Sequence, residues 1–114
     1  MKTLNAGEST ITYHEAESLL TFTGSMRLAN MKEYDVVAEF LHESSESSID
    51  RLTLDLKSLR FLNSSGITTL SLFILTCKKQ GYPKITVVKN DTISWQQKSI
   101  TNFKKLWDEV EIEN

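Results

Sequence analysis

The chain has 114 residues, of which 39% are hydrophobic and 25% are charged, and this composition is typical of one globular domain. Its 13 basic and 15 acidic residues leave a formal net charge of −2, which offers no electrostatic attraction to nucleic acid or to an anionic membrane. We therefore predict a single domain over residues 1–114 that binds neither. With no apolar run near the ~20 residues that span a bilayer, no secretory signal and a single cysteine, a cytoplasmic protein is expected.

The first half of the chain predicts a hairpin followed by a helix. Two short apolar stretches, Thr10–Tyr13 and Leu19–Thr23, are separated by a polar segment that is typical of a turn. Apolar residues then recur at helical spacing over Met31–Leu41, with Asn30 as the expected N-cap. The serine–glutamate stretch His42–Ser48 that follows is interpreted as a solvated loop.

The second half predicts strands alternating with helices. Leu52–Leu56 alternates with a period of two, as a strand does, and Lys57–Leu62 is expected to connect it to the next helix. That helix covers Ser65 to about Gln80 and is stopped by Gly81. The remaining predicted elements are a strand over Ile85–Val88, a helix from a cap at Asn90, Asp91 or Thr92 to about Leu106, and a short edge strand over Val110–Ile112.

This order of elements predicts an α/β fold. Strands that alternate with helices need crossover connections, which give a largely parallel sheet, with the opening hairpin antiparallel to it. We expect a mixed sheet of four to five strands with helices packed on it. Leu72 and Leu75 lie off the apolar stripe of their helix, so that helix is expected to present a second side to the core or to a partner.

The residues that catalysis or a cofactor would need are absent from the sequence. His14, His42 and Cys77 are too isolated for a metal site, and the position of Cys77 on an apolar helical stripe favours a packed thiol. The four glycines stand too far apart for a phosphate-binding loop, and neither histidine is placed to activate Ser64. We therefore predict no catalytic residue, no metal, no cofactor and no enzymatic activity.

The segment Asn63-Ser64-Ser65-Gly66, between a strand and a helix, carries the functional signal. Serine is a favoured N-cap, so a well-capped helix is one interpretation. A helix N-terminus also suits a phosphate, and phosphorylation of Ser64 would add about −1.5 to −2 charges there. Desolvating that phosphate on docking, at a cost of roughly 3 kcal/mol, would weaken a complex by two decades in affinity. The residues alone leave both interpretations open.

This segment resembles the STAS domain of anti-sigma-factor antagonists. The signature of that family is a strand ending in Phe and an apolar residue, then Asp-Ser-Ser-Gly and Leu or Ile, then an amphipathic helix. The resemblance covers most of the chain and implies a STAS-type sandwich. Asn63 departs from it, because the phosphorylated members usually have aspartate there. The matching residues are Phe61, Leu62, Ser64, Ser65, Gly66 and Ile67.

The resemblance implies a phosphorylation-controlled partner switch that acts on transcription or on another target. Ser64 would be the phosphoacceptor, with Ser65 as the runner-up, and the partners would be an anti-sigma-type serine kinase and a serine phosphatase. Capture of the kinase would free its target. The implied partner surface consists of Asn63, Ser64, Ser65, Gly66, Thr68 and Thr69, together with Ser25, Met26 and Arg27 from the loop expected after Gly24.

Two other functions compete with the switch. The chain is alternatively a non-phosphorylated STAS scaffold or accessory subunit of a signalling or transport complex, in which Ser64 only caps the helix. The uncharged Asn63 favours this alternative. A small-ligand sensor is a third hypothesis, which has no support beyond the fold class.

Overall fold

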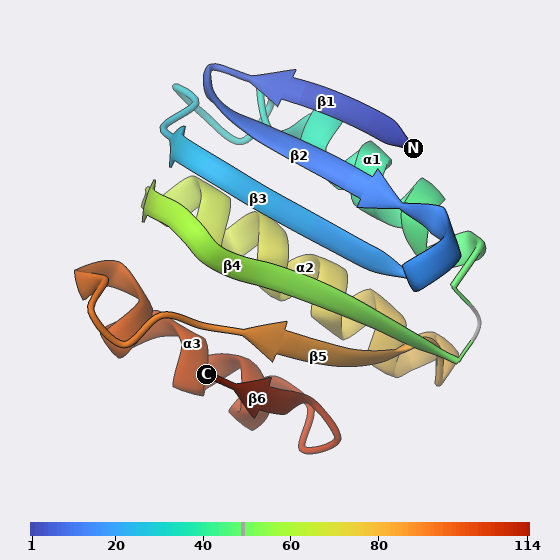
Figure 1. Ribbon diagram of the computed structural model, residues 1–114. Helices are drawn as coiled ribbons and strands as arrows, with labels where there is room; N and C mark the ends of the chain where they lie inside the picture. The colour runs from blue at the N-terminus through green and yellow to red at the C-terminus, as the bar shows by residue number, and fades with distance from the viewer. Residues whose placement is uncertain (49) are drawn as a thin grey trace.

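The computed structural model describes residues 1–48 and 50–114, which form one six-stranded sheet covered by three α-helices (Figure 1). The strands are β1 (Lys2–Ala6), β2 (Glu8–His14), β3 (Leu19–Met26), β4 (Arg51–Leu62), β5 (Lys84–Val88) and β6 (Glu111–Glu113). The helices are α1 (Asp35–Glu46), α2 (Ser64–Gln80) and α3 (Ser94–Leu106), with a short 3₁₀ helix, η1 (Glu15–Glu17), between β2 and β3. Within these residues, no helix is both long and apolar enough to cross a bilayer.

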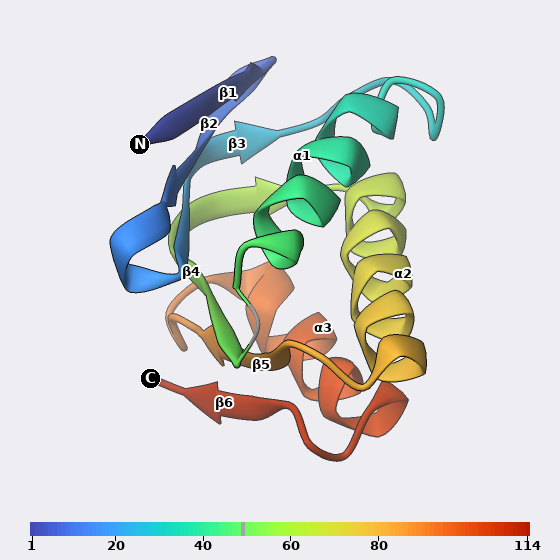
Figure 2. The same cartoon turned by 90° about the vertical axis from the view of Figure 1, so that its right-hand side faces the viewer.

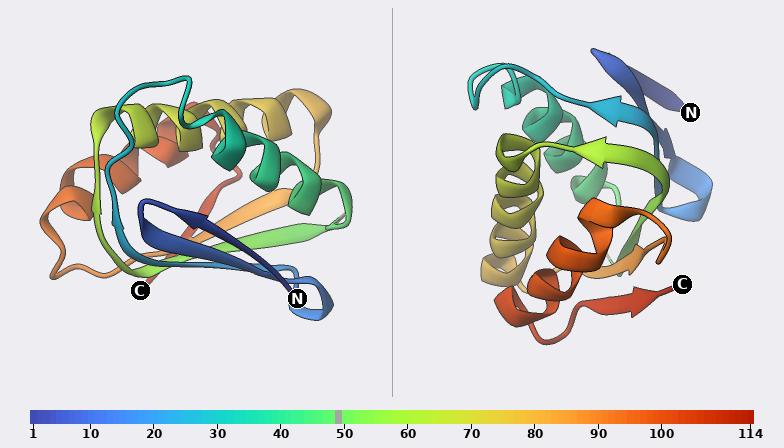
Figure 3. Two further views of the ribbon diagram at one scale, coloured as in Figure 1. Left: turned by 90° about the horizontal axis from the view of Figure 1, so that it is seen from above. Right: turned by 90° about the vertical axis from the view of Figure 1, so that its left-hand side faces the viewer.

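The strands lie in the sheet in their order along the chain. β1, β2 and β3 form an antiparallel meander, and β3 to β6 are parallel to one another. Each parallel step runs in the same direction, and right-handed crossovers therefore place α1, α2 and α3 on the same face of the sheet. Figures 2 and 3 show this single helical layer, with α2 between α1 and α3. The predicted α/β fold with a mixed sheet is confirmed.

The sheet has six strands, not the four to five that we predicted, because β1 was missed. β1 is an edge strand that pairs with β2 from Lys2 opposite Tyr13 to Ala6 opposite Ser9. Only its last residue, Ala6, is buried, so β1 lacks the alternating apolar pattern that identifies a half-buried strand.

The core lies between the sheet and the helical layer. Burying one large apolar side chain there contributes about 1.5–3 kcal/mol to stability. The opposite face of the sheet is polar and includes the cross-strand pair Thr12 and Thr21. Among the core residues are Ile11, Leu20, Phe22, Leu52, Leu54, Leu56 and Val87 from the strands, and Val37, Leu41, Leu70, Phe73, Ile74, Ile100 and Phe103 from the helices.

The predicted limits of the first helix were wrong at both ends. α1 begins at Asp35 and not near Asn30, whose side chain accepts a hydrogen bond from the Glu33 N–H in a turn before the helix (3.0 Å). α1 continues to Glu46, so most of the supposed serine–glutamate loop is helical. Ser44 and Ser45 are buried there because their hydroxyls donate to carbonyls one turn earlier and need no water.

Three further boundaries differ from the prediction. The supposed connector Lys57–Leu62 continues β4, which buries Leu59 and Leu62. α3 begins at Ser94 without a side-chain cap, because the Asn90 side chain accepts from Thr92 in the preceding turn. β6 starts one residue later than expected. The predicted stop of α2 at Gly81 is confirmed, since this glycine has φ 81° and donates its N–H to the Cys77 carbonyl (2.8 Å).

Gly24 allows β3 to pack closely against β2. Gly24 has φ +88° and pairs with Ser9, and a Cβ at this position would lie 2.2 Å from the Glu8 carbonyl oxygen. The chain therefore needs glycine at position 24 both for its backbone conformation and for space.

We expect Gly24→Ala to lower the free energy of unfolding by about 3 kcal/mol, measured by urea denaturation. Gly81→Ala is the matched control, because Gly81 also has a positive φ but a Cβ there meets nothing within 4 Å. The control should lose only about 1 kcal/mol. Equal losses in the two variants would contradict the close contact between β2 and β3.

Candidate partner-binding site

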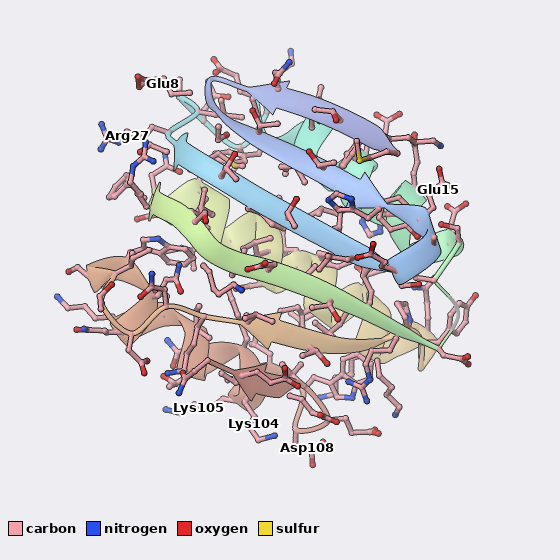
Figure 4. All side chains as sticks on the ribbon, in the orientation of Figure 1. Glu8, Glu15, Arg27, Lys104, Lys105 and Asp108 are labelled. Carbon is pink, nitrogen blue, oxygen red and sulfur yellow. The ribbon has the colours of Figure 1, made fainter. Side chains whose placement is uncertain are left out.

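The candidate site lies where β3 and β4 end and α2 begins. These strands are parallel neighbours with Met26 opposite Leu62, so their carboxyl ends meet at one edge of the sheet. The chain leaves β3 at Arg27, which projects from that edge (Figure 4). It leaves β4 at Asn63 and starts α2 at Ser64. The topology therefore brings together the segment around Arg27 and the segment that begins at Asn63, both of which the sequence analysis assigned to the partner surface.

The side chain of Asn63 connects three segments at this edge. Its Oδ1 accepts hydrogen bonds from the Gly66 N–H (3.1 Å) and from the Tyr34 hydroxyl (2.5 Å). Its Nδ2 donates to the Leu28 carbonyl (2.9 Å), and its backbone N–H donates to the Met26 carbonyl (3.3 Å). Asn63 thus caps α2 and also holds the segment between β3 and α1.

This network explains why asparagine suits position 63. Oδ1 already faces two donors, so the other terminal atom must be the one that faces the Leu28 carbonyl, and that atom has to donate. An aspartate would place an oxygen against the carbonyl oxygen and lose this hydrogen bond. The departure from the STAS signature therefore has a structural cause in this chain.

Tyr34 and Gly66 support Asn63 from the inside. Tyr34 is buried, and its hydroxyl lies between Asn63, the Met26 carbonyl and the Leu28 N–H. Burial raises the pKa of the Tyr34 hydroxyl, and the Leu28 N–H partly opposes that shift in pKa. A Cβ on Gly66 would lie 2.8 Å from the Tyr34 hydroxyl and 2.2 Å from Leu62 Cδ1, so any side chain at position 66 would have to displace Leu62 and Tyr34.

The two serines are free of any capping role. A serine cap was one of the two interpretations that the residues left open, and the structure places Asn63 at the cap instead. Ser64 is exposed as the first residue of α2, and Ser65 is half-buried. Of the four N–H groups at the helix start, those of Asn63 and Gly66 bond to protein atoms. Among the described residues, the N–H groups of Ser64 and Ser65 remain as donors beside the exposed hydroxyl.

The other predicted site residues divide between the surface and the interior. Thr68 is exposed one turn after Ser64, and the exposed Arg27 places its guanidinium 4.4 Å from the centre of the Phe61 ring. Ser25 is half-buried at the end of β3, so no loop begins at Gly24 as we had expected.

Three of the predicted contact residues have no side chain at the surface. Met26 is buried in the core, and so is Gly66 at the start of α2. Thr69 is buried, and its hydroxyl donates to the Ser65 carbonyl (2.8 Å). These three residues position the site from within, and the surface itself consists of Arg27, Ser64, Ser65 and Thr68 with part of Asn63.

Sequence reasoning missed a groove of about 190 Å³ between α1 and α2 that continues this surface. Met31 and Leu72, with exposed fractions of 42% and 52%, lie on its walls beside Thr76. The position of Leu72 off the apolar stripe was the available signal. Met31 gave no signal because we assigned it to the buried face of a helix that starts later.

In the part of the chain that the structure describes, no three His, Cys, Asp or Glu side chains gather closely enough to hold a metal ion. Cys77 is buried, and burial raises the pKa of its thiol to about 11, which keeps it protonated at neutral pH.

Comparisons with known proteins support the fold. No protein-family model matches the chain, and no curated protein matches it. A chain in the crystal structure of the diguanylate cyclase SiaD in complex with its activator SiaC, from Pseudomonas aeruginosa, matches with a TM-score of 0.71 and 15% identity, over 99% of this chain and 98% of that chain. The fold is that of SiaC.

Two structures of SiaC alone agree with this match. SiaC of Pseudomonas aeruginosa matches with a TM-score of 0.65 and 17% identity, over 100% of this chain and 98% of that chain. Apo-SiaC from the same organism matches with a TM-score of 0.61 and 14% identity, over the full length of both chains. At this level of identity the likeness to SiaC shows a common architecture, and the function of this chain requires its own argument.

We expect Asn63→Asp to lower the free energy of unfolding by about 1–2 kcal/mol in urea denaturation, because the bond to the Leu28 carbonyl is lost. Asn102→Asp is the control, since Asn102 is exposed on α3 and undergoes the same change of charge. This control should stay within about 0.5 kcal/mol of the unsubstituted chain. An Asn63→Asp protein as stable as the control would contradict the assigned role of Nδ2.

Proposed function

We propose that this chain is a non-catalytic regulatory subunit that binds a signalling enzyme and controls its activity. The observation that carries the proposal is a rigid, solvent-facing surface around Ser64 and Thr68 that continues into the groove between α1 and α2. The similarity in fold to SiaC, which is described as the activator of a diguanylate cyclase, supports a regulatory role of this kind.

The surface has the features that favour protein binding. Leu72 and Met31 expose apolar side chains at the groove, and small polar residues, Ser64 and Thr68, lie next to them. Interfaces commonly combine an apolar centre with a polar rim. The hydrogen bonds of Asn63 fix the backbone beneath this surface, so docking there costs little ordering entropy.

We propose a diguanylate cyclase as the partner, in agreement with the SiaD–SiaC complex. This proposal corresponds to the accessory-subunit hypothesis of the sequence analysis. The chain would then act by controlling a signalling enzyme and not by capturing an anti-sigma factor. Any effect on transcription would follow from the activity of that enzyme.

The test titrates the purified chain into each purified diguanylate cyclase encoded by the same genome and measures conversion of GTP to cyclic di-GMP. One cyclase should bind and change its rate. Thr68→Arg should weaken that binding at least about tenfold, because a long cation replaces a small hydroxyl at the centre of the surface.

Ser58→Arg is the matched control, because Ser58 is an exposed hydroxyl on β4, away from the helical layer. It should leave both affinity and rate unchanged. If no cyclase responds, or if both variants weaken binding equally, the proposed partner or the proposed surface is wrong.

A second candidate function adds phosphorylation of Ser64 as the control of this docking. The observation that favours it is the exposed Ser64 hydroxyl at a helix end where two N–H donors remain available. A phosphate there would meet the positive end of α2 and place charge at the edge of the docking surface. An anti-sigma-type serine kinase and a serine phosphatase remain the proposed modifying enzymes.

We expect incubation with the cognate kinase and ATP to add one phosphate, read by intact mass and located by peptide mapping at Ser64. Ser64→Ala should abolish the addition, and Ser65→Ala should retain it. The phosphorylated chain should bind its partner about two decades more weakly. A phosphate at another residue, or unchanged affinity, would remove the switch and leave the docking proposal standing.

A further inference from the structure

The helical face divides its charges between its two sides. α1 carries four exposed acidic residues and no lysine or arginine. α2 and α3 carry lysines and no aspartate or glutamate. Lys104 and Lys105 project from α3 at the edge of the molecule farthest from α1 (Figure 4). The acidic residues are Asp35, Glu39, Glu43 and Glu46, and the exposed lysines are Lys78, Lys79, Lys98, Lys104 and Lys105.

The helix between these two sides exposes an apolar seam. Thr68, Leu72, Leu75 and Lys79 follow one another along the outer face of α2 at intervals of four, three and four residues. Leu72 and Leu75 are 52% and 37% exposed and line a shallow hollow of about 550 Å³. Alternating steps of three and four are the spacing by which two helices pair side by side.

A second copy of this chain complements this face. Two identical faces can meet about a two-fold axis that runs either along α2 or across it. An axis across α2 would place α1 on α1 and bring acidic residues together. An axis along α2 places the acidic α1 of each copy opposite the basic α3 of the other, and lets Leu72 and Leu75 meet their own counterparts. It also brings the two Lys79 residues together at the end of the seam, where their long side chains can turn toward solvent. Charge complementarity therefore selects the second arrangement.

We propose that the chain forms a homodimer through its helical face, with the two-fold axis along α2. The smallest face of a body with Cα dimensions of 30 × 27 × 24 Å measures about 650 Å² in projection, and side chains enlarge it. Specific interfaces take about 600–1,000 Å² from each partner, so even this smallest projection reaches the lower end of that range. Glutamate and lysine side chains are long and flexible enough to pair across the flanks of the central seam.

In this arrangement the two α2 helices run parallel, so Ser64 of one copy and Ser64 of the other lie at the same end of the interface. Ser64 lies on the outer face of α2, in line with Thr68 and Leu72. Negative charge added at both copies would therefore weaken the dimer by repulsion. The dimer covers Thr68 and Leu72, so it competes with the proposed enzyme partner for the same surface, and it can be tested on the purified chain without that enzyme.

Sedimentation velocity over a range of protein and salt concentrations tests the dimer. We expect a mass of twice 13.0 kDa at low salt. As the salt concentration rises, the dimer should weaken and dissociate at higher protein concentrations. Glu39→Lys with Glu43→Lys should weaken the dimer at least about tenfold, and so should Lys98→Glu with Lys105→Glu. The chain with all four reversals should dimerise again, because α1 and α3 are then oppositely charged once more.

Matched variants separate the interface from general effects of charge and folding. Glu113→Lys and Lys57→Glu change exposed charges on the sheet and should leave the dimer unaffected. Ser64→Glu should weaken it, whereas Ser58→Glu should not. Circular dichroism and thermal melts confirm that each variant is folded. A monomer at every concentration would overturn the proposal, as would a dimer that is insensitive to reversal of the α1 and α3 charges.

Discussion

The hydrogen bonds of one side chain, Asn63, hold together the end of the molecule where two parallel strands stop and α2 starts. The amide accepts on one atom and donates on the other, so it satisfies the first turn of α2 and the Leu28 carbonyl at the same time. The buried Tyr34 and the missing side chain of Gly66 leave room for this arrangement. Because hydrogen-bonding groups from three segments meet at Asn63, the surface above it already has its shape before a binding protein docks.

The main consequence is that one residue, Asn63, caps α2, and a different residue, Ser64, is the candidate for modification or contact. If Ser64 capped the helix, its hydroxyl would be occupied and any modification would unravel the first turn. With Asn63 as the cap, Ser64 can be modified or contacted without loss of the helix. The same geometry serves a permanent accessory subunit and a phosphorylated switch, which differ only in whether charge is ever added at this hydroxyl.

The direction in which the chain crosses the sheet decides the rest of the surface. Three successive parallel steps run the same way, so all three helices share one face and the other face remains polar. The acidic and basic residues of this nearly neutral chain are thereby sorted across α1, α2 and α3. A charge separation of this kind fixes the orientation in which a partner can bind the face and favours partners of complementary charge.

The amino-acid sequence by itself determined the α/β class, the parallel strands, the stop of α2 at Gly81 and the position of Ser64 at a helix start, because these features depend on local periodicity and on single-residue conformation. It missed β1, which as an edge strand buries too little to alternate, and it assigned Ser44 and Ser45 to a loop although their hydroxyls bond within their own helix. Only the tertiary structure decided that Asn63 is the cap and that Met26 and Thr69 are buried. The partners of the Asn63 side chain at Tyr34 and Leu28 lie 29 and 35 residues away, and bonds over such separations leave no local pattern in the sequence.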